Sequence, residues 1–266
     1  MKAIVLLILS FCAALAQSHY RASFAGPFSY ARPGIARAPF AIEQVAEVMV
    51  TYPDGHRPMR NCTEWLYRDY QGRTRGERPM TGPGGDPSIR LVQIVDPIAG
   101  YQYVIDTVNG IAHRMKVARI PETQSQLSPS IEEMSLSSFH RNILIVEKIG
   151  RTQPDVKSQN LGTRVIDGIE TRGVRTTVTY RSASSADASH VVKTEAWASD
   201  QLKIVVRSER QDSKWGDSWA RLVRISTDEP DEGLFRPPAD YMIVDEPGPF
   251  RIDIALPSSA LSGKKQ

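Results

Sequence analysis

Residues 100–117 read GYQYVIDTVNGIAHRMKV, and their pattern indicates the fold class. In the first half of this stretch Tyr101, Tyr103 and Ile105 stand at alternate positions, which is the period of an extended strand with one buried face. Asn109-Gly110 then signals a tight hairpin turn, and a second extended segment follows over 111–117. The two segments are predicted to be antiparallel neighbours, because parallel strands need long crossover connections.

The same pattern continues on both sides of this hairpin. Further extended segments are predicted at 41–52, 57–70, 73–78, 90–95, 163–166, 174–180, 191–198, 202–209 and 219–226. Turn signals such as Pro53-Asp54-Gly55 and Asp167-Gly168 separate them, and nothing resembles the strand–helix alternation of a parallel α/β protein. We predict a mainly β fold, a single large curved antiparallel sheet forming a half-barrel-like meander with one or two short helices.

The middle of the chain departs from this rhythm. Residues 119–142 are rich in Ser and Gln, and Ser130-Ile131-Glu132-Glu133 has the pattern of a capped start of a short helix. A lid, a covering helix and a disordered loop all remain open for this segment. We interpret 142–149 as a strand and 151–159 as a polar linker.

The N-terminus has the pattern of a secretory signal. Met1-Lys2 is followed by an apolar run over 3–15 and by the cleavage pattern Ala14-Leu15-Ala16. An apolar run of this length falls short of the roughly 20 residues that span a bilayer. We expect a signal peptide over 1–16, an extended arm over 17–40, an antiparallel β domain over 41–245 and a loose C-terminal tail over 246–266. The mature chain is then exported, periplasmic or secreted, with no transmembrane segment.

Composition narrows the function classes. Charged residues make up 24% of the 266 residues, the net charge is +3, and acidic and basic residues are interspersed, so no nucleic-acid partner is expected. Cys62 is the only cysteine after the signal, which excludes an intramolecular disulfide in the mature chain. We interpret it as a small apolar residue on a strand.

Motifs for catalysis and for cofactor binding are missing from the sequence. There is no G-x-S-x-G, Gly-rich phosphate loop, H-E-x-x-H or paired-Cys zinc spacing, so we expect no enzyme and no cofactor. If cleavage follows Ala16, the new amino terminus, two backbone amides and the imidazole of His19 could form the planar nitrogen set that Cu(II) or Ni(II) prefers. The favoured interpretation remains that the protein binds no metal.

Two groups of residues are candidates for ligand binding. Six large aromatic residues are spread over several predicted strands: Trp65, Tyr67, Tyr101, Tyr103, Trp197 and Trp219. If they share one face, they would line an apolar groove in a concave sheet, whereas the alternative is plain core packing. Arg73 and Arg75 lie in a charged hairpin and could clamp an anion. The alternative for them is a solvated hairpin with surface ion pairs.

Several stretches together resemble a family of exported bacterial proteins of unknown function. They are PFAIE (39–43), YRDYQGRTRGE (67–77), DPIAGY (96–101), LGT (161–163), IDGIETRG (166–173), EAW (195–197), EPD (229–231), Leu234-Phe235, Pro238 and Tyr241. The resemblance implies an exported location and no particular reaction. The order of elements is similar, more weakly, to Lol-type lipoprotein carriers, whose unclosed β-barrel with helices over its mouth holds acyl chains. Only 119–142 could supply such helices here.

These observations favour an exported, non-enzymatic binding protein. Its ligand would be apolar or amphipathic, such as a lipid or an acyl chain, held in the concave sheet. The alternative is a cell-envelope protein–protein interaction module with a filled core, no ligand, and contact through a sheet edge.

Overall fold

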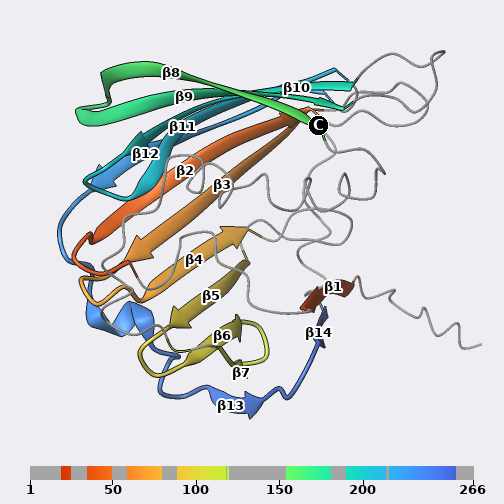
Figure 1. Ribbon diagram of the computed structural model, residues 1–266. Helices are drawn as coiled ribbons and strands as arrows, with labels where there is room; N and C mark the ends of the chain where they lie inside the picture. The colour runs from red at the N-terminus through yellow and green to blue at the C-terminus, as the bar shows by residue number, and fades with distance from the viewer. Residues whose placement is uncertain are drawn as a thin grey trace, which may run out of the picture.

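The computed structural model describes residues 19–24, 35–49, 59–79, 89–117, 119, 154–180, 190–213 and 216–255. Twelve strands form one open sheet in the order β13-β7-β6-β5-β4-β3-β2-β12-β11-β10-β9-β8 (Figure 1). Their bounds are β2 Phe40–Met49, β3 Met59–Arg68, β4 Thr74–Pro79, β5 Arg90–Asp96, β6 Tyr101–Asp106, β7 Ile111–Lys116, β8 Asp155–Ile166, β9 Ile169–Tyr180, β10 His190–Ser199, β11 Ile204–Asp212, β12 Ser218–Ser226 and β13 Met242–Asp245.

The sheet consists of two antiparallel meanders joined side by side. Strands β2 to β7 pair in chain order, as do β8 to β12, and β12 pairs with β2 to join the two halves. The short β13 adds to β7 in parallel. A separate two-stranded sheet pairs β1 (His19–Phe24) with β14 (Phe250–Ala255).

The predicted fold class, a single mainly antiparallel sheet, is confirmed. Three details differ from the sequence expectations. β8 begins at Asp155, inside the segment interpreted as a polar linker, and β14 lies in the expected tail. The helical element in the described part of the chain is the 3-10 turn η1 (Glu232–Phe235). The segments 120–153 and 1–18, with the expected lid and signal, lie outside the described residues.

Strand register divides the side chains of the sheet between two faces. On one face, which we call the Phe40 face, a cross-strand row runs through Phe40, Arg68, Thr74, Val95 and Gln102. The adjacent row on the same face runs through Ile42, Leu66, Gly76, Gln93 and Val104. The opposite face, which we call the Trp65 face, carries the residues between these positions.

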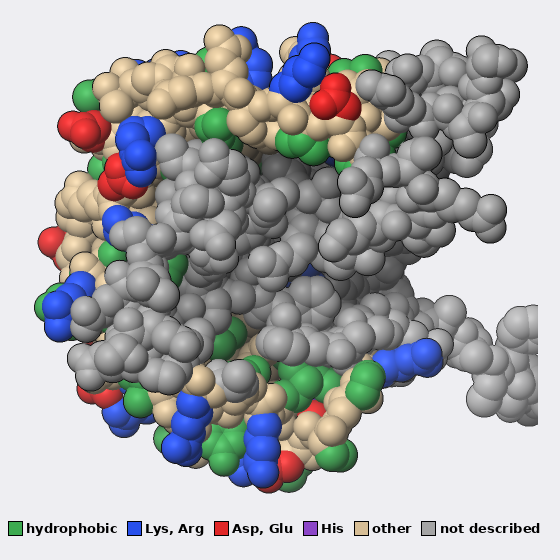
Figure 2. All heavy atoms as spheres, viewed as in Figure 1, with side chains coloured by type: hydrophobic (Ala, Val, Ile, Leu, Met, Phe, Trp, Pro, Cys, Tyr) green, Lys and Arg blue, Asp and Glu red, His purple; other side chains and the backbone are tan. Residues whose placement is uncertain are grey.

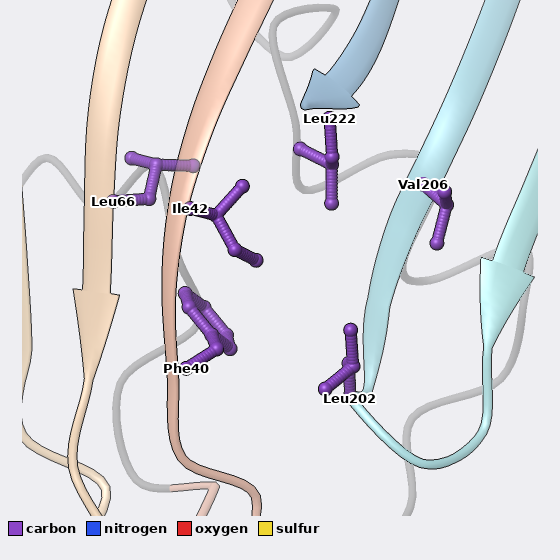
Figure 3. Packing of buried hydrophobic residues seen from close by; sticks show 6 residues of the cluster. All are labelled: Phe40, Ile42, Leu66, Leu202, Val206 and Leu222. Carbon is purple, nitrogen blue, oxygen red and sulfur yellow. The ribbon is translucent and has the colours of Figure 1, made fainter. Parts of the chain in front are cut away.

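Both faces carry apolar cores. On the Phe40 face a buried cluster spans β3, β2, β12 and β11 and the turn before β11 (Figure 3): Phe40, Ile42, Leu66, Leu202, Val206 and Leu222. On the Trp65 face η1 packs Phe235 against a second cluster of Val92, Ile94, Ile105 and Ala112. Strand β5 has buried residues on both faces, in an uninterrupted run from Leu91 to Val95.

The Phe40 face lies on the inner side of the bend in the sheet. A guanidinium nitrogen of Arg68 on β3 donates a hydrogen bond to the carbonyl oxygen of Leu202, in the turn that leads into β11. β11 is three places from β3 in the strand order, a distance of roughly 14 Å in a flat sheet. A side chain spans this interval only where the far strands curl over the Phe40 face, as Figure 1 shows for the upper strands.

Candidate functional site

Two buried glutamines form the centre of the candidate site. Gln93 on β5 is 4% exposed and Gln102 on β6 is 0% exposed, and both belong to the Phe40 face. Within the described residues neither amide oxygen nor amide nitrogen of these two side chains has a hydrogen-bond partner. Native proteins pair nearly all buried polar atoms, since an unpaired one costs about 1–3 kcal/mol. The two amides therefore mark a place where polar partners are missing from the described chain.

Arg68 places a cation in the same cross-strand row as Gln102. Its Nε donates to the carbonyl oxygen of Ala38 over 2.8 Å, and its guanidinium lies 4.4 Å from the centroid of the Phe40 ring. Burial lowers the pKa of Arg68 to about 9, so the group stays protonated at neutral pH. Nη1 has no hydrogen-bond partner among the described atoms. The cross-strand row that contains Arg68 and Gln102 therefore holds hydrogen-bond donors without acceptors, and these donors lie beside apolar side chains.

The six predicted aromatic residues all belong to the Trp65 face. Register places Trp65 and Tyr67 on this face of β3, Tyr101 and Tyr103 on β6, Trp197 on β10 and Trp219 on β12. The six aromatic residues therefore share one face of the sheet. This face is opposite the inner Phe40 face. Their role in ligand binding stays a prediction.

Each tryptophan described on this face is held by charged neighbours of the same chain. The guanidinium of Arg90 lies 3.8 Å from the Trp65 ring centroid, and that of Arg164 lies 3.6 Å from the Trp197 ring centroid. The indole nitrogen of Trp219 donates to the Glu47 carboxylate over 2.8 Å. These contacts fix the rings in place and cover part of their surface.

Charged side chains of the hairpin between β3 and β4 are buried, although Tyr70 and Gln71 at its tip are exposed, so the alternative of a solvated hairpin with surface ion pairs is wrong for them. Arg73 Nε lies 2.5 Å from Oδ2 of Asp69, which is 1% exposed. Arg75 bonds to Glu77 and, through Nη1, to the carbonyl oxygen of Leu234 over 3.0 Å. The segment around η1 lies against Arg73 and Arg75 and shields them from water. Anion binding by Arg73 and Arg75 stays a prediction.

Glu77 forms ion pairs with two arginines, Arg75 and Arg90, on the Trp65 face. Its carboxylate accepts hydrogen bonds of 2.8 Å from both Arg75 and Arg90. Burial opposes the charge on Glu77, but these two hydrogen bonds outweigh burial and hold its pKa below the usual value. The carboxylate is thereby committed to the fold, which leaves it no role as a proton acceptor near neutral pH.

A groove of about 470 Å³ opens on the Trp65 face where β2, β12 and β11 meet. Residues that line it include Glu47, Arg207, Glu209, Gln211, Trp219 and Arg221. Trp219 is the only one of these lining residues that the sequence predicted as a site residue. The remaining lining residues come together through cross-strand register, which the sequence does not reveal. Figure 2 shows basic and acidic side chains interspersed on the described surface that it displays.

Neither a metal-binding cluster nor a membrane-spanning helix is present among the described residues. They contain no group of His, Cys, Asp and Glu side chains that could hold a metal ion. The metal set considered for His19 includes residues 17 and 18, which lie outside the described ranges. No helix in the described part of the chain is long and apolar enough to cross a membrane.

Comparison with known proteins found no matching family model and no matching curated protein. Several solved structures are similar to this one at low sequence identity. LprF of Mycobacterium bovis is 11% identical with a TM-score of 0.30, covering 73% of this chain and 89% of its own. A LolA superfamily protein of Nitrosomonas europaea is 9% identical with a TM-score of 0.30, covering 76% and 92%. The lipoprotein LppX of Mycobacterium tuberculosis is 16% identical with a TM-score of 0.27, covering 71% and 89%.

Proposed function

We propose that this protein is an exported, non-enzymatic binding protein for an amphipathic ligand, a lipid or acyl chain with a polar end. The ligand lies against the Phe40 face of the sheet. The observation that carries the proposal is the pair of buried, unpartnered amides of Gln93 and Gln102.

The surroundings of these amides suit a ligand with one polar and one apolar part. Val95 and Val104, which are buried, lie directly opposite Gln102 and Gln93 on the neighbouring strands and would contact an acyl chain. A carboxyl, hydroxyl or amide group on the ligand would supply the hydrogen bonds that the two amides lack. Burial of an acyl chain contributes about 0.8 kcal/mol for each methylene group.

Export is the second part of the proposal. It is supported by the N-terminal pattern over residues 1–16, a basic start, an apolar run and an A-x-A cleavage site. Comparison of the mass of the periplasmic or secreted protein with that of the cytosolic form tests this part. Mature protein beginning at Gln17 outside the cytosol is expected, and uncleaved protein confined to the cytosol would contradict export.

Titration with a fluorescent fatty acid tests ligand binding. The mature protein should bind a labelled dodecanoic acid saturably, and a Gln93→Leu/Gln102→Leu double variant should bind it at least tenfold more weakly. Gln71→Leu, a change at an exposed turn residue, is the matched control and should bind as the unmodified protein does. Absence of saturable binding, or equal affinity in the double variant, would overturn the proposal.

A second candidate function rests on the edge strand β8. This strand is 12 residues long, ends the sheet, and exposes Val156 (56%) and Val165 (68%). A long exposed edge offers backbone hydrogen-bonding groups to an added strand. An extended segment of an envelope protein is the occupant that this edge suits.

The two functions respond differently to substitution. If β8 is the binding surface, a Val156→Lys/Val165→Lys variant loses a cross-linked envelope partner that the Gln93→Leu/Gln102→Leu variant retains. The same partner recovered in equal yield with both variants would remove this candidate.

A further inference from the structure

The groove on the Trp65 face combines an indole ring with two facing arginines. Arg221 on β12 and Arg207 on β11 are direct cross-strand partners. Like charges in this position repel one another, and sheets usually place an opposite charge there. The other cross-strand neighbour of Arg221 is Val45, which supplies no charge. The arrangement therefore brings two guanidinium groups together at one side of a groove that also holds the carboxylates of Glu47, Glu209 and Asp217.

The carboxylates of the groove are already engaged by other groups. Glu209 accepts bonds from Nε and Nη2 of Arg207 at 3.0 and 2.5 Å. Glu47 accepts from the indole of Trp219, and Asp217 accepts from the backbone nitrogen of Asp212 over 3.2 Å. Within the described chain no carboxylate pairs with Arg221, whose guanidinium lies 5.7 Å from the Trp219 ring centroid. The exposed guanidinium of Arg221 therefore remains available to an added anion.

We propose that this groove binds a small oxyanion, a carboxylate or phosphate, carried on a flat apolar body. The oxyanion pairs with Arg221, and the flat body lies against Trp219. A guanidinium binds carboxylate and phosphate oxygens in a paired geometry. The groove volume of about 470 Å³ falls within the range of small-molecule sites. This site is on the opposite face of the sheet from the proposed lipid-binding surface, and it stands independently of that function.

Isothermal titration calorimetry of the mature protein with phenyl phosphate and 1-naphthoate tests the proposal. Both probes should bind, whereas inorganic phosphate, without a flat body, and 1-naphthalenemethanol, without a charge, should bind at least tenfold more weakly. Arg221→Gln should weaken binding of the two probes by about tenfold or more. Arg172→Gln removes an exposed arginine that pairs with Asp200 outside the groove, and it should leave binding unchanged.

A second variant separates ligand binding from a structural effect. Glu209→Gln releases Arg207 from its carboxylate partner, so the probes should bind several-fold more tightly than to the unmodified protein. A purely structural role for these residues gives no increase. No binding of either probe at millimolar concentration, or equal binding by Arg221→Gln, would overturn the proposal. The Gln93→Leu/Gln102→Leu variant should bind both probes normally, which keeps this outcome separate from that of lipid binding.

Discussion

Gly173 on β9 lies directly opposite Trp197 on β10, and the indole ring occupies the space where a β-carbon would be. A Cβ built on Gly173 would lie 2.7 Å from Cη2 and Cζ3 of the ring. Trp197 is 6% exposed, and the Arg164 guanidinium lies 3.6 Å from its centroid. The glycine is therefore required by packing, because the ring and the backbone approach more closely than any side chain would allow.

Substitution of this glycine should destabilise the protein. Gly173→Ala is expected to lower the free energy of unfolding by about 1–3 kcal/mol, since the new methyl group must displace a buried ring. Urea unfolding measures the change. Gly248→Ala, where nothing lies within 4 Å of the added carbon, is the control and should stay within about 0.5 kcal/mol. In a Trp197→Leu background the cost of Gly173→Ala should shrink, and an unchanged cost would contradict the packing argument.

Arg68 should contribute more to stability than any exposed arginine. Arg68→Met keeps the length of the side chain but leaves the carbonyl groups of Ala38 and Leu202 without their donors. We expect a loss of about 2–5 kcal/mol in the free energy of unfolding. Arg236→Met, which breaks an exposed ion pair with Glu232, should change it by less than about 0.5 kcal/mol. Equal effects of the two substitutions would show that the inner hydrogen bonds of Arg68 do not hold the sheet together.

Glu77 should make the protein sensitive to acid. Its pKa is lower in the folded protein than in the unfolded chain, where it is about 4.3. Between the two values the unfolded chain binds more protons, so stability rises with pH. The stabilisation is fully present above about pH 4.3 and is lost as the pH falls through the folded pKa. The stability difference between the unmodified protein and Glu77→Gln should narrow below pH 4.3, and a constant difference from pH 7 to pH 3 would contradict this assignment.

The buried amides should cost stability when no ligand is bound. Removing an unpaired polar group from the interior relieves its desolvation penalty, so Gln102→Leu should be neutral or should raise the free energy of unfolding by about 1 kcal/mol in ligand-free protein. Thermal unfolding of delipidated protein measures the effect. A loss of 2 kcal/mol or more would mean that the amide has partners within the protein.

Local pattern was sufficient to predict the meander because each strand of the first half is bounded by its own turn signal. Asn109-Gly110 ends β6 and opens β7 within a residue or two of the predicted bounds. The start of β8 was missed since this edge strand is exposed on both faces and its polar residues show no alternation. The parallel addition of β13 to β7 depends on a contact between segments more than a hundred residues apart, which local pattern does not contain.

The candidate site was harder to predict than the fold. Alternation places Trp65 and Tyr67 on one face and Leu66 and Arg68 on the other, but it does not say which face becomes the inner one. Burial of the charged hairpin depends on a segment 159 residues away, where Glu229 accepts from the backbone nitrogen of Tyr70. A usable signal for the inner site was present, since Gln93 interrupts the apolar run from Leu91 to Val95.

The binding face itself can be mapped with a photoreactive fatty acid. Mature protein would be loaded with a diazirine-labelled fatty acid, irradiated and digested, and the labelled peptides identified by mass spectrometry. We expect adducts on peptides from β5 and β6, next to Gln93 and Gln102, and an excess of unlabelled fatty acid should abolish them. Adducts spread over the surface without competition, or confined to the groove at Trp219, would contradict a lipid-binding Phe40 face.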